Sequence, residues 1–177
     1  KEKFWPSERK NPANSLKNMI HKTRTLLNTI APEVDELLIT RLRGYEWSPD
    51  VEIECDVEQF EQPYNQLKTM RPEESIELGM KAFELYEGSI LPGASVEWID
   101  RLNNDYQTAF IDICKTLLSV FVEKQRWDDV ICVCRKAYET APEVEEFTIY
   151  LMQALVNCEY HGQAIEHYEK YSTMLWN

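Results

Sequence analysis

The alternation of apolar and polar residues predicts an amphipathic helix from Asn11 to about Asn28. At about 100° per residue, its apolar positions fall on one arc of about 120°, the width of a stripe that faces a protein core. These positions are Leu16, Met19, Ile20, Thr23, Leu26, Leu27 and Ile30. Asn11 and Pro12 suit a helix start, because an Asn side chain accepts a hydrogen bond from a free backbone N–H and a proline at the first helical position loses none.

The opposite face of this helix carries cations, amides and hydroxyls but no carboxylate. It comprises Asn14, Lys17, Asn18, His21, Lys22, Arg24 and Thr25. A face without acids suits the major groove of DNA, because Lys and Arg neutralise phosphates and Asn reads base edges. The alternative is an ordinary solvated surface, on which His21 would be a neutral imidazole in water.

The segment after Pro32 predicts a β-hairpin. Apolar and polar residues alternate from Leu37 to Arg41, the chain turns at Arg43 and Gly44, and it returns over 45–48. A helix followed by such a hairpin is the way in which a winged helix ends. The hairpin would then be the wing.

Beyond Asp56 the pattern is helical throughout, with helices predicted over 56–70, 72–86 and 95–126 and a loop over 87–93. Residues 129–137 then align with residues 163–171 at a spacing of 34, which is the tetratricopeptide period. The expected fold class is therefore mainly α: a partial winged helix, made of a recognition helix and a β-hairpin wing, followed by a tetratricopeptide-like α-helical array.

Charge divides the chain in the same way. It has 19 Lys and Arg against 31 Asp and Glu, a net charge of −12. Residues 1–48 hold nine basic and six acidic side chains, so the remainder holds 10 basic and 25 acidic ones. Such asymmetry indicates two jobs, one suited to a phosphate backbone and one not, although an ordinary solvated surface would also produce it.

No residue pattern indicates catalysis, a cofactor or a metal site, so the chain is not expected to be an enzyme. Five cysteines are an odd number, mostly in apolar helical stretches, and they predict a reduced, cytoplasmic protein without a membrane span. Cys132 and Cys134 are interpreted as packing residues, and His161 and His167 are six apart, the wrong spacing for chelation from one helix face. The aromatic residues after position 95 are expected mainly to pack between helices, with a partner-binding surface as the alternative.

Five features resemble the Streptomyces antibiotic regulatory protein family of transcriptional activators. In chain order they are Trp5-Pro6, Asn14-Ser15-Leu16-Lys17 with Arg24, the Arg41-x-Arg43-Gly44-Tyr45 hairpin, and Asp56-Val57-Glu58-Gln59-Phe60 before the helices. The resemblance implies two domains. Residues 1–52 would be the C-terminal part of a winged-helix DNA-binding domain, and residues 53–177 a bacterial transcriptional activator domain of tetratricopeptide-like helices.

The resemblance also implies a set of DNA-binding residues. They are Asn14, Lys17, Asn18, His21, Lys22 and Arg24 on the recognition helix, with Arg41 and Arg43 in the wing. Leu42 stands where related wings usually have Gly, and Glu46 where a basic residue is common, so both are expected to lower DNA affinity. A winged helix also needs helices before its recognition helix, so residues 1–177 alone are expected to bind DNA weakly.

Two functions are therefore open. The first is a DNA-binding transcriptional regulator, probably acting as an activator, whose complete parent winged helix holds double-stranded DNA. Its helical domain would form a homodimer or contact a protein such as RNA polymerase or a sensor module. The second is a tetratricopeptide-like interaction scaffold that does not bind DNA through this segment.

Overall fold

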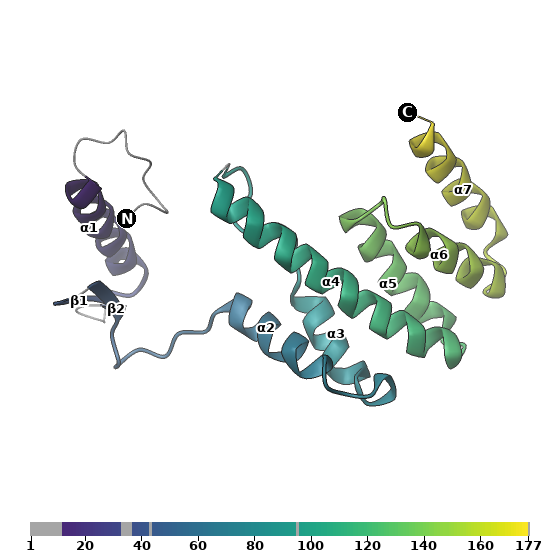
Figure 1. Ribbon diagram of the computed structural model, residues 1–177, viewed down its shortest axis with the longest axis horizontal. Helices are drawn as coiled ribbons and strands as arrows, with labels where there is room; N and C mark the ends of the chain where they lie inside the picture. The colour runs from purple at the N-terminus through teal and green to yellow at the C-terminus, as the bar shows by residue number, and fades with distance from the viewer. Residues whose placement is uncertain (1–11, 33–36, 43, 95, 177) are drawn as a thin grey trace. The chain divides into compact units, whose positions relative to one another are not determined.

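The computed structural model describes residues 12–32, 37–42, 44–94 and 96–176. The chain divides into an N-terminal unit that ends at Glu54 and a C-terminal unit that begins at Cys55 (Figure 1). The described residues are mainly helical, with one small antiparallel hairpin. This confirms the predicted fold class, and each unit is described by itself below.

The N-terminal unit consists of helix α1 (Pro12–Ile30) and a hairpin of β1 (Leu38–Arg41) and β2 (Gly44–Trp47). The strands are antiparallel, and their register runs from Leu38 opposite Trp47 to Arg41 opposite Gly44. A two-residue connection, Leu42–Arg43, therefore joins them, and the side chain of Leu42 is fully exposed at the tip. Residue 43 itself lies outside the described residues.

The C-terminal unit is a run of helices joined by short connections. Its elements are α2 (Asp56–Leu67), the 3-10 helix η1 (Pro72–Glu74), α3 (Ile76–Leu85), α4 (Glu97–Glu123), α5 (Trp127–Thr140), α6 (Glu145–Asn157) and α7 (His161–Leu175). Each α-helix packs against the next one along the chain, from α2 to α7 (Figure 1). The one predicted helix over 72–86 is thus two elements, because the chain makes a 3-10 turn before Ser75.

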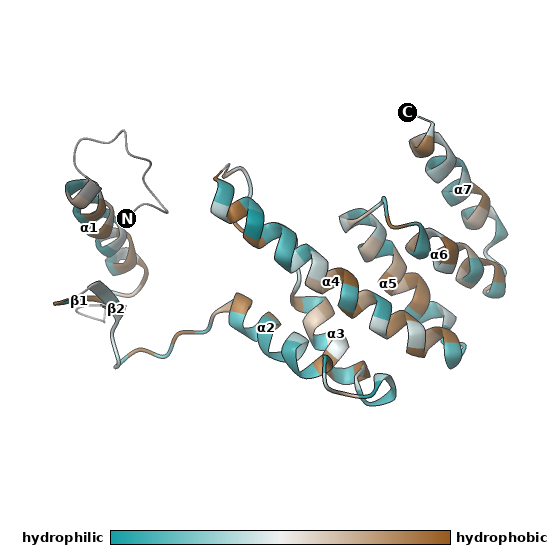
Figure 2. Cartoon of the chain, viewed as in Figure 1, coloured by the Kyte–Doolittle hydropathy of each residue, from teal (hydrophilic) through white to brown (hydrophobic). Residues whose placement is uncertain are grey.

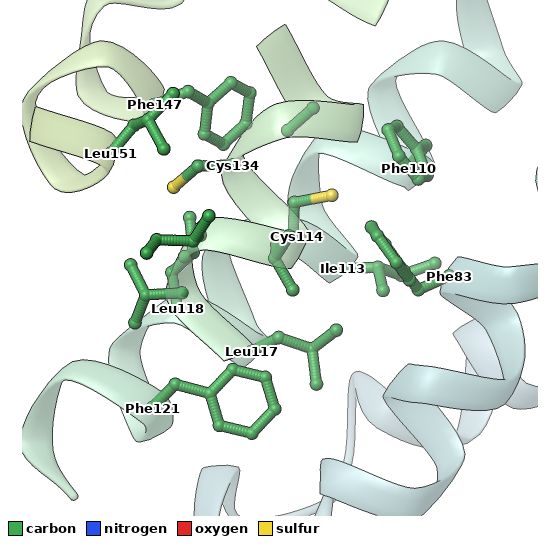
Figure 3. Packing of buried hydrophobic residues seen from close by; sticks show 14 of the residues in the cluster. Phe83, Phe110, Ile113, Cys114, Leu117, Leu118, Phe121, Cys134, Phe147 and Leu151 are labelled. Atoms are coloured by element: carbon green, nitrogen blue, oxygen red, sulfur yellow. The ribbon is translucent and has the colours of Figure 1, made fainter. Parts of the chain in front are cut away.

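The longest helix, α4, provides the centre of this unit's core. Its C-terminal half contributes Phe110, Leu117, Leu118 and Phe121, all at most 1% exposed. Figure 2 shows the contrast along α4, since its N-terminal half is mostly hydrophilic. In Figure 3 these residues meet side chains from α3, α5 and α6 in one continuous cluster.

Helices α3 and α4 approach closely at Gly79. A Cβ atom built there would lie 2.9 Å from Cδ2 of Leu117, closer than real Cβ contacts. Because Leu117 is buried, it has little room to move away. The absence of a side chain at position 79 therefore sets how closely the two helices pack.

The 34-residue spacing recurs in the backbone geometry. Helix α5 begins at Trp127 and α7 at His161, 34 residues later. The residues that end the preceding helices, Gln125 and Glu159, both have positive φ, at 54° and 62°. The sequence repeat is thus also a structural repeat of helix, left-handed turn and helix, although its assignment as a tetratricopeptide stays a prediction.

Candidate nucleic-acid interface

Arg24 joins helix α1 to the hairpin. Its Nε donates a hydrogen bond to the Leu38 carbonyl oxygen at 2.8 Å, and its Nη2 donates to Oγ1 of Thr40, also at 2.8 Å. The guanidinium carbon lies 6.0 Å from the centre of the Tyr45 ring, within cation–π range. These three contacts reach both strands, so one half-buried side chain fixes how the helix meets the hairpin.

Most of the other predicted DNA-binding residues of α1 are exposed. They are Asn14, Lys17, Asn18, His21 and Lys22. Helix α1 has no acidic residue from end to end. Because its first turn is not acidic either, the positive end of the helix dipole is not offset by a local carboxylate, which favours an approaching anion.

In the hairpin, Arg41 forms an ion pair with Glu46. The Arg41 Nε atom lies 2.6 Å from Oε1 of Glu46, and both side chains are about half exposed. The register places Glu46 opposite Ile39, diagonal to Arg41 and on the same face of the hairpin. The charge of Arg41 is thus partly balanced before any DNA approaches.

The structure therefore groups the predicted residues in two ways. It places the exposed residues of α1 along one helix, and it places Arg24 and Arg41 in contacts with the hairpin. Arg43 lies outside the described residues. Whether any of these residues contacts DNA stays a prediction.

Two roles in this unit were missed from sequence. Arg24 anchors the hairpin as well as standing on the predicted DNA face, and a helical period alone could not show which strand it would reach. The Glu46 partner of Arg41 could have been found. A two-residue connection at positions 42 and 43 fixes the register, and the register makes positions 41 and 46 diagonal neighbours.

Only part of the apolar stripe on α1 is covered. Leu16, Ile20 and Leu27 are half-buried, whereas Met19, Leu26 and Ile30 are exposed. The covered positions lie on the edge of the stripe that adjoins Arg24, about 80° around the helix from Leu16. Another apolar surface would therefore be needed to bury the remainder.

In the C-terminal unit, the two neighbouring cysteines of α5 face different surroundings. Cys132 is exposed, whereas Cys134 is buried beside Phe147 and Leu151 (Figure 3). Burial raises the pKa of the Cys134 thiol to about 12, and it also raises that of Cys114. Both buried thiols stay protonated at neutral pH and pack as small apolar groups.

The two histidines of α7 also differ. His161 is exposed, whereas His167 is half-buried, with its ring centre 4.7 Å from that of Tyr138 in an edge-on arrangement. Burial lowers the pKa of His167, so this imidazole is neutral at pH 7. In the described part of the chain, no three His, Cys, Asp or Glu side chains gather where they could hold a metal ion.

A polar groove crosses the C-terminal unit at α5. One cavity of about 610 Å³ lies between α4, α5 and the loop after α3, and another of about 440 Å³ lies between α5 and α7. Glu139 lines both. The first cavity is also lined by Glu87 and Asp100, so carboxylates outnumber its one cation, Lys136.

Lys136 is largely committed to its own fold. Its Nζ donates to the Phe83 carbonyl oxygen at 2.6 Å and lies 4.7 Å from the centre of the Phe83 ring. Burial lowers its pKa, and nearby acidic groups oppose that shift. The groove therefore presents a surface of amides and carboxylates, which suits a polypeptide segment that carries basic side chains.

Among the helices that the structure describes, none is both long enough and apolar enough to cross a lipid bilayer.

Comparison with protein families gives one match. Residues 55–177 match the family described as the bacterial transcriptional activator domain. The match begins at the residue where the C-terminal unit begins. No curated protein matches the chain.

Proposed function

The chain belongs to the family of bacterial transcriptional activator domains, and from this premise we propose that it is part of a DNA-binding transcriptional regulator. The family is one of transcription activators and not of enzymes, so the C-terminal unit has an activator-type role. In this proposal, the N-terminal unit is the C-terminal part of a winged helix, and it positions the protein on double-stranded DNA.

The observation that carries the proposal is the acid-free face of α1 held against the hairpin by Arg24. Lys17, His21 and Lys22 are exposed on this face, and Asn18 lies between them. Arg24 fixes the angle between helix and hairpin through both strands. A helix that enters the major groove needs such a fixed angle if the wing is to reach the neighbouring backbone.

The exposed half of the α1 stripe supports the winged-helix part of the proposal. In a complete winged helix, the preceding helices would cover Met19, Leu26 and Ile30. Without that cover, the helix has a weaker hydrophobic hold. Residues 1–177 should therefore bind DNA less tightly than the complete winged helix does.

For the C-terminal unit we propose contacts with protein rather than with DNA. From Cys55 onward the chain carries 10 basic and 22 acidic side chains, a charge that repels phosphate. Its polar groove would hold a basic segment of a partner such as RNA polymerase or a sensor module. A second copy of the chain is the other partner that we propose.

The test is fluorescence anisotropy with duplex DNA across a salt series, on a chain extended at its N-terminus to complete the winged helix. Replacing Lys17 or Lys22 with Ala should weaken binding and reduce the slope of log K against log salt by about 0.9 each, if each contacts one phosphate. Lys124→Ala, which removes an exposed lysine of the C-terminal unit, is the matched control and should change neither quantity.

One observation favours the alternative, an interaction scaffold that does not bind DNA through this segment. Arg24 and Arg41 both use their guanidinium groups inside the unit, which leaves fewer cations for phosphate. If the extended chain bound no DNA at low salt, this second function would replace the first.

A further inference from the structure

Helix α7 is apolar over far more of its surface than its one neighbour covers. At about 100° per residue, its apolar, aromatic and histidine side chains span an arc of about 200°, about twice the width needed to pack on one surface. Ala164, His167 and Tyr171 form the half that packs toward α5 and α6 and are buried or half-buried. The other half, which we call the free face, consists of Ile165, Tyr168, Ser172, Leu175 and the C-cap residue Trp176.

The structural repeat shows what the free face is built to hold. Three of its residues stand 34 positions after residues of α5 and its C-cap: Ile165 after Ile131, Tyr168 after Cys134, and Leu175 after Ala141. The earlier three are 7%, 0% and 0% exposed, whereas the later three are 59%, 57% and 62% exposed. Figure 3 shows Cys134 beside Phe147 and Leu151 of α6. The free face is therefore the repeat equivalent of a surface that holds a helix.

We propose that the free face of α7 is a homodimer interface, on which α7 of a second copy packs antiparallel. The pairing specifies the homodimer named in the proposed function, but it does not depend on DNA binding. A two-fold pairing about the level of residue 170 places Ile165 opposite Leu175, and Tyr168 opposite Ser172. Each contact thus joins a side chain to a partner of similar or smaller size, as a self-complementary interface requires.

Charge favours a second copy at this place. The free face holds no charged side chain, so two strongly acidic copies could meet there without opposing like charges. Lys170 points to the opposite side of α7, about 170° away, and is paired with Glu166 at 2.8 Å. The charges of α7 therefore lie mainly behind the proposed interface.

The test is sedimentation velocity on the chain over a range of concentrations, without DNA. The chain should form a dimer, and Ile165→Glu or Tyr168→Glu should weaken that dimer about 30-fold or more, the size of a hot-spot loss. Ile149→Glu is the matched control, because Ile149 is an exposed isoleucine of α6 outside the free face, and it should leave the dimer unchanged. Thermal unfolding within 2 °C of the parent chain, roughly the error of such assays, would show that each variant is folded.

Three results would overturn the proposal. The chain could remain monomeric at all concentrations, or its dimer could persist in both folded α7 variants. A dimer that is dissociated only by Leu26→Glu would place the interface on the exposed stripe of α1 instead. Because no DNA is present, each of these results leaves the DNA-binding proposal untouched.

Discussion

Replacing Gln125 or Glu159 with Gly should stabilise the protein. Both residues follow a helix and have positive φ, at 54° and 62°. The two turns share one hydrogen-bond pattern. Arg126 N–H donates to the Phe121 carbonyl and Tyr160 N–H donates to the Leu155 carbonyl, each at 2.8 Å. This is the Schellman arrangement, in which Gly is the preferred residue at the left-handed position.

The magnitude follows from two opposing effects. A left-handed backbone costs a residue with a side chain about 1–2 kcal/mol. Glycine avoids that cost, but it loses about 0.5–1 kcal/mol through its greater freedom in the unfolded chain. The net gain in the free energy of unfolding should be about 0.5–1 kcal/mol at each site. Glu159→Gly should gain a few tenths more, because it removes a negative charge from the negative end of α6.

The assay is urea and thermal unfolding, followed by circular dichroism at 222 nm. Each variant should melt about 2–4 °C above the parent chain. Gln153→Gly is the matched control, because Gln153 is exposed in the interior of α6, where Gly should cost about 1 kcal/mol. If Gln125→Gly and Glu159→Gly destabilised the chain as Gln153→Gly does, the left-handed turns would be wrong, and with them the structural repeat.

Three further outcomes are expected in the C-terminal unit. Phe121→Ala should lower the free energy of unfolding by about 3–5 kcal/mol in urea titration, because Phe121 is completely buried, and a loss below about 1 kcal/mol would contradict the described core. In the native protein a thiol reagent should modify Cys132 quickly and Cys134 only at the rate of unfolding, and equal rates would refute the difference in burial. Burial, with a 3.0 Å hydrogen bond to Asp112, raises the pKa of Tyr64 from 10.0 to about 12, so its contribution to stability is complete below pH 10 and is lost as pH rises toward 12. Absorbance at 295 nm should show this late ionisation, and Tyr64→Phe should remove it.

Periodicity was sufficient to predict the helices and the hairpin, because local sequence determines both. The predicted helices over 56–70 and 95–126 correspond to Asp56–Leu67 and Glu97–Glu123. The differences lie at the ends, where Lys124 and Gln125 leave the helix through a left-handed turn that contains no glycine. Without a Gly or Pro at that point, the sequence does not mark the end of the helix.

Tertiary contacts were harder to predict, because a pattern gives a direction but not a partner. The helical period placed Arg24 on the polar face of α1, yet its guanidinium group reaches back to Leu38 and Thr40. The same period gave α1 one apolar stripe, but it could not show that Met19 and Leu26 stay exposed. Which neighbour covers such a face depends on residues distant in sequence, so only the structure could separate the covered edge from the exposed one.

The central claim, that α1 meets DNA and the helical array does not, is tested most directly by lysine acetylation footprinting. The full-length regulator would be acetylated at low salt with and without saturating duplex DNA, and each lysine measured by mass spectrometry. Lys17 and Lys22 should be protected by DNA, whereas Lys81 and Lys124 of the C-terminal unit should react equally in both samples. Protection confined to the C-terminal unit, or no protection at Lys17 and Lys22 when DNA is bound, would contradict the claim.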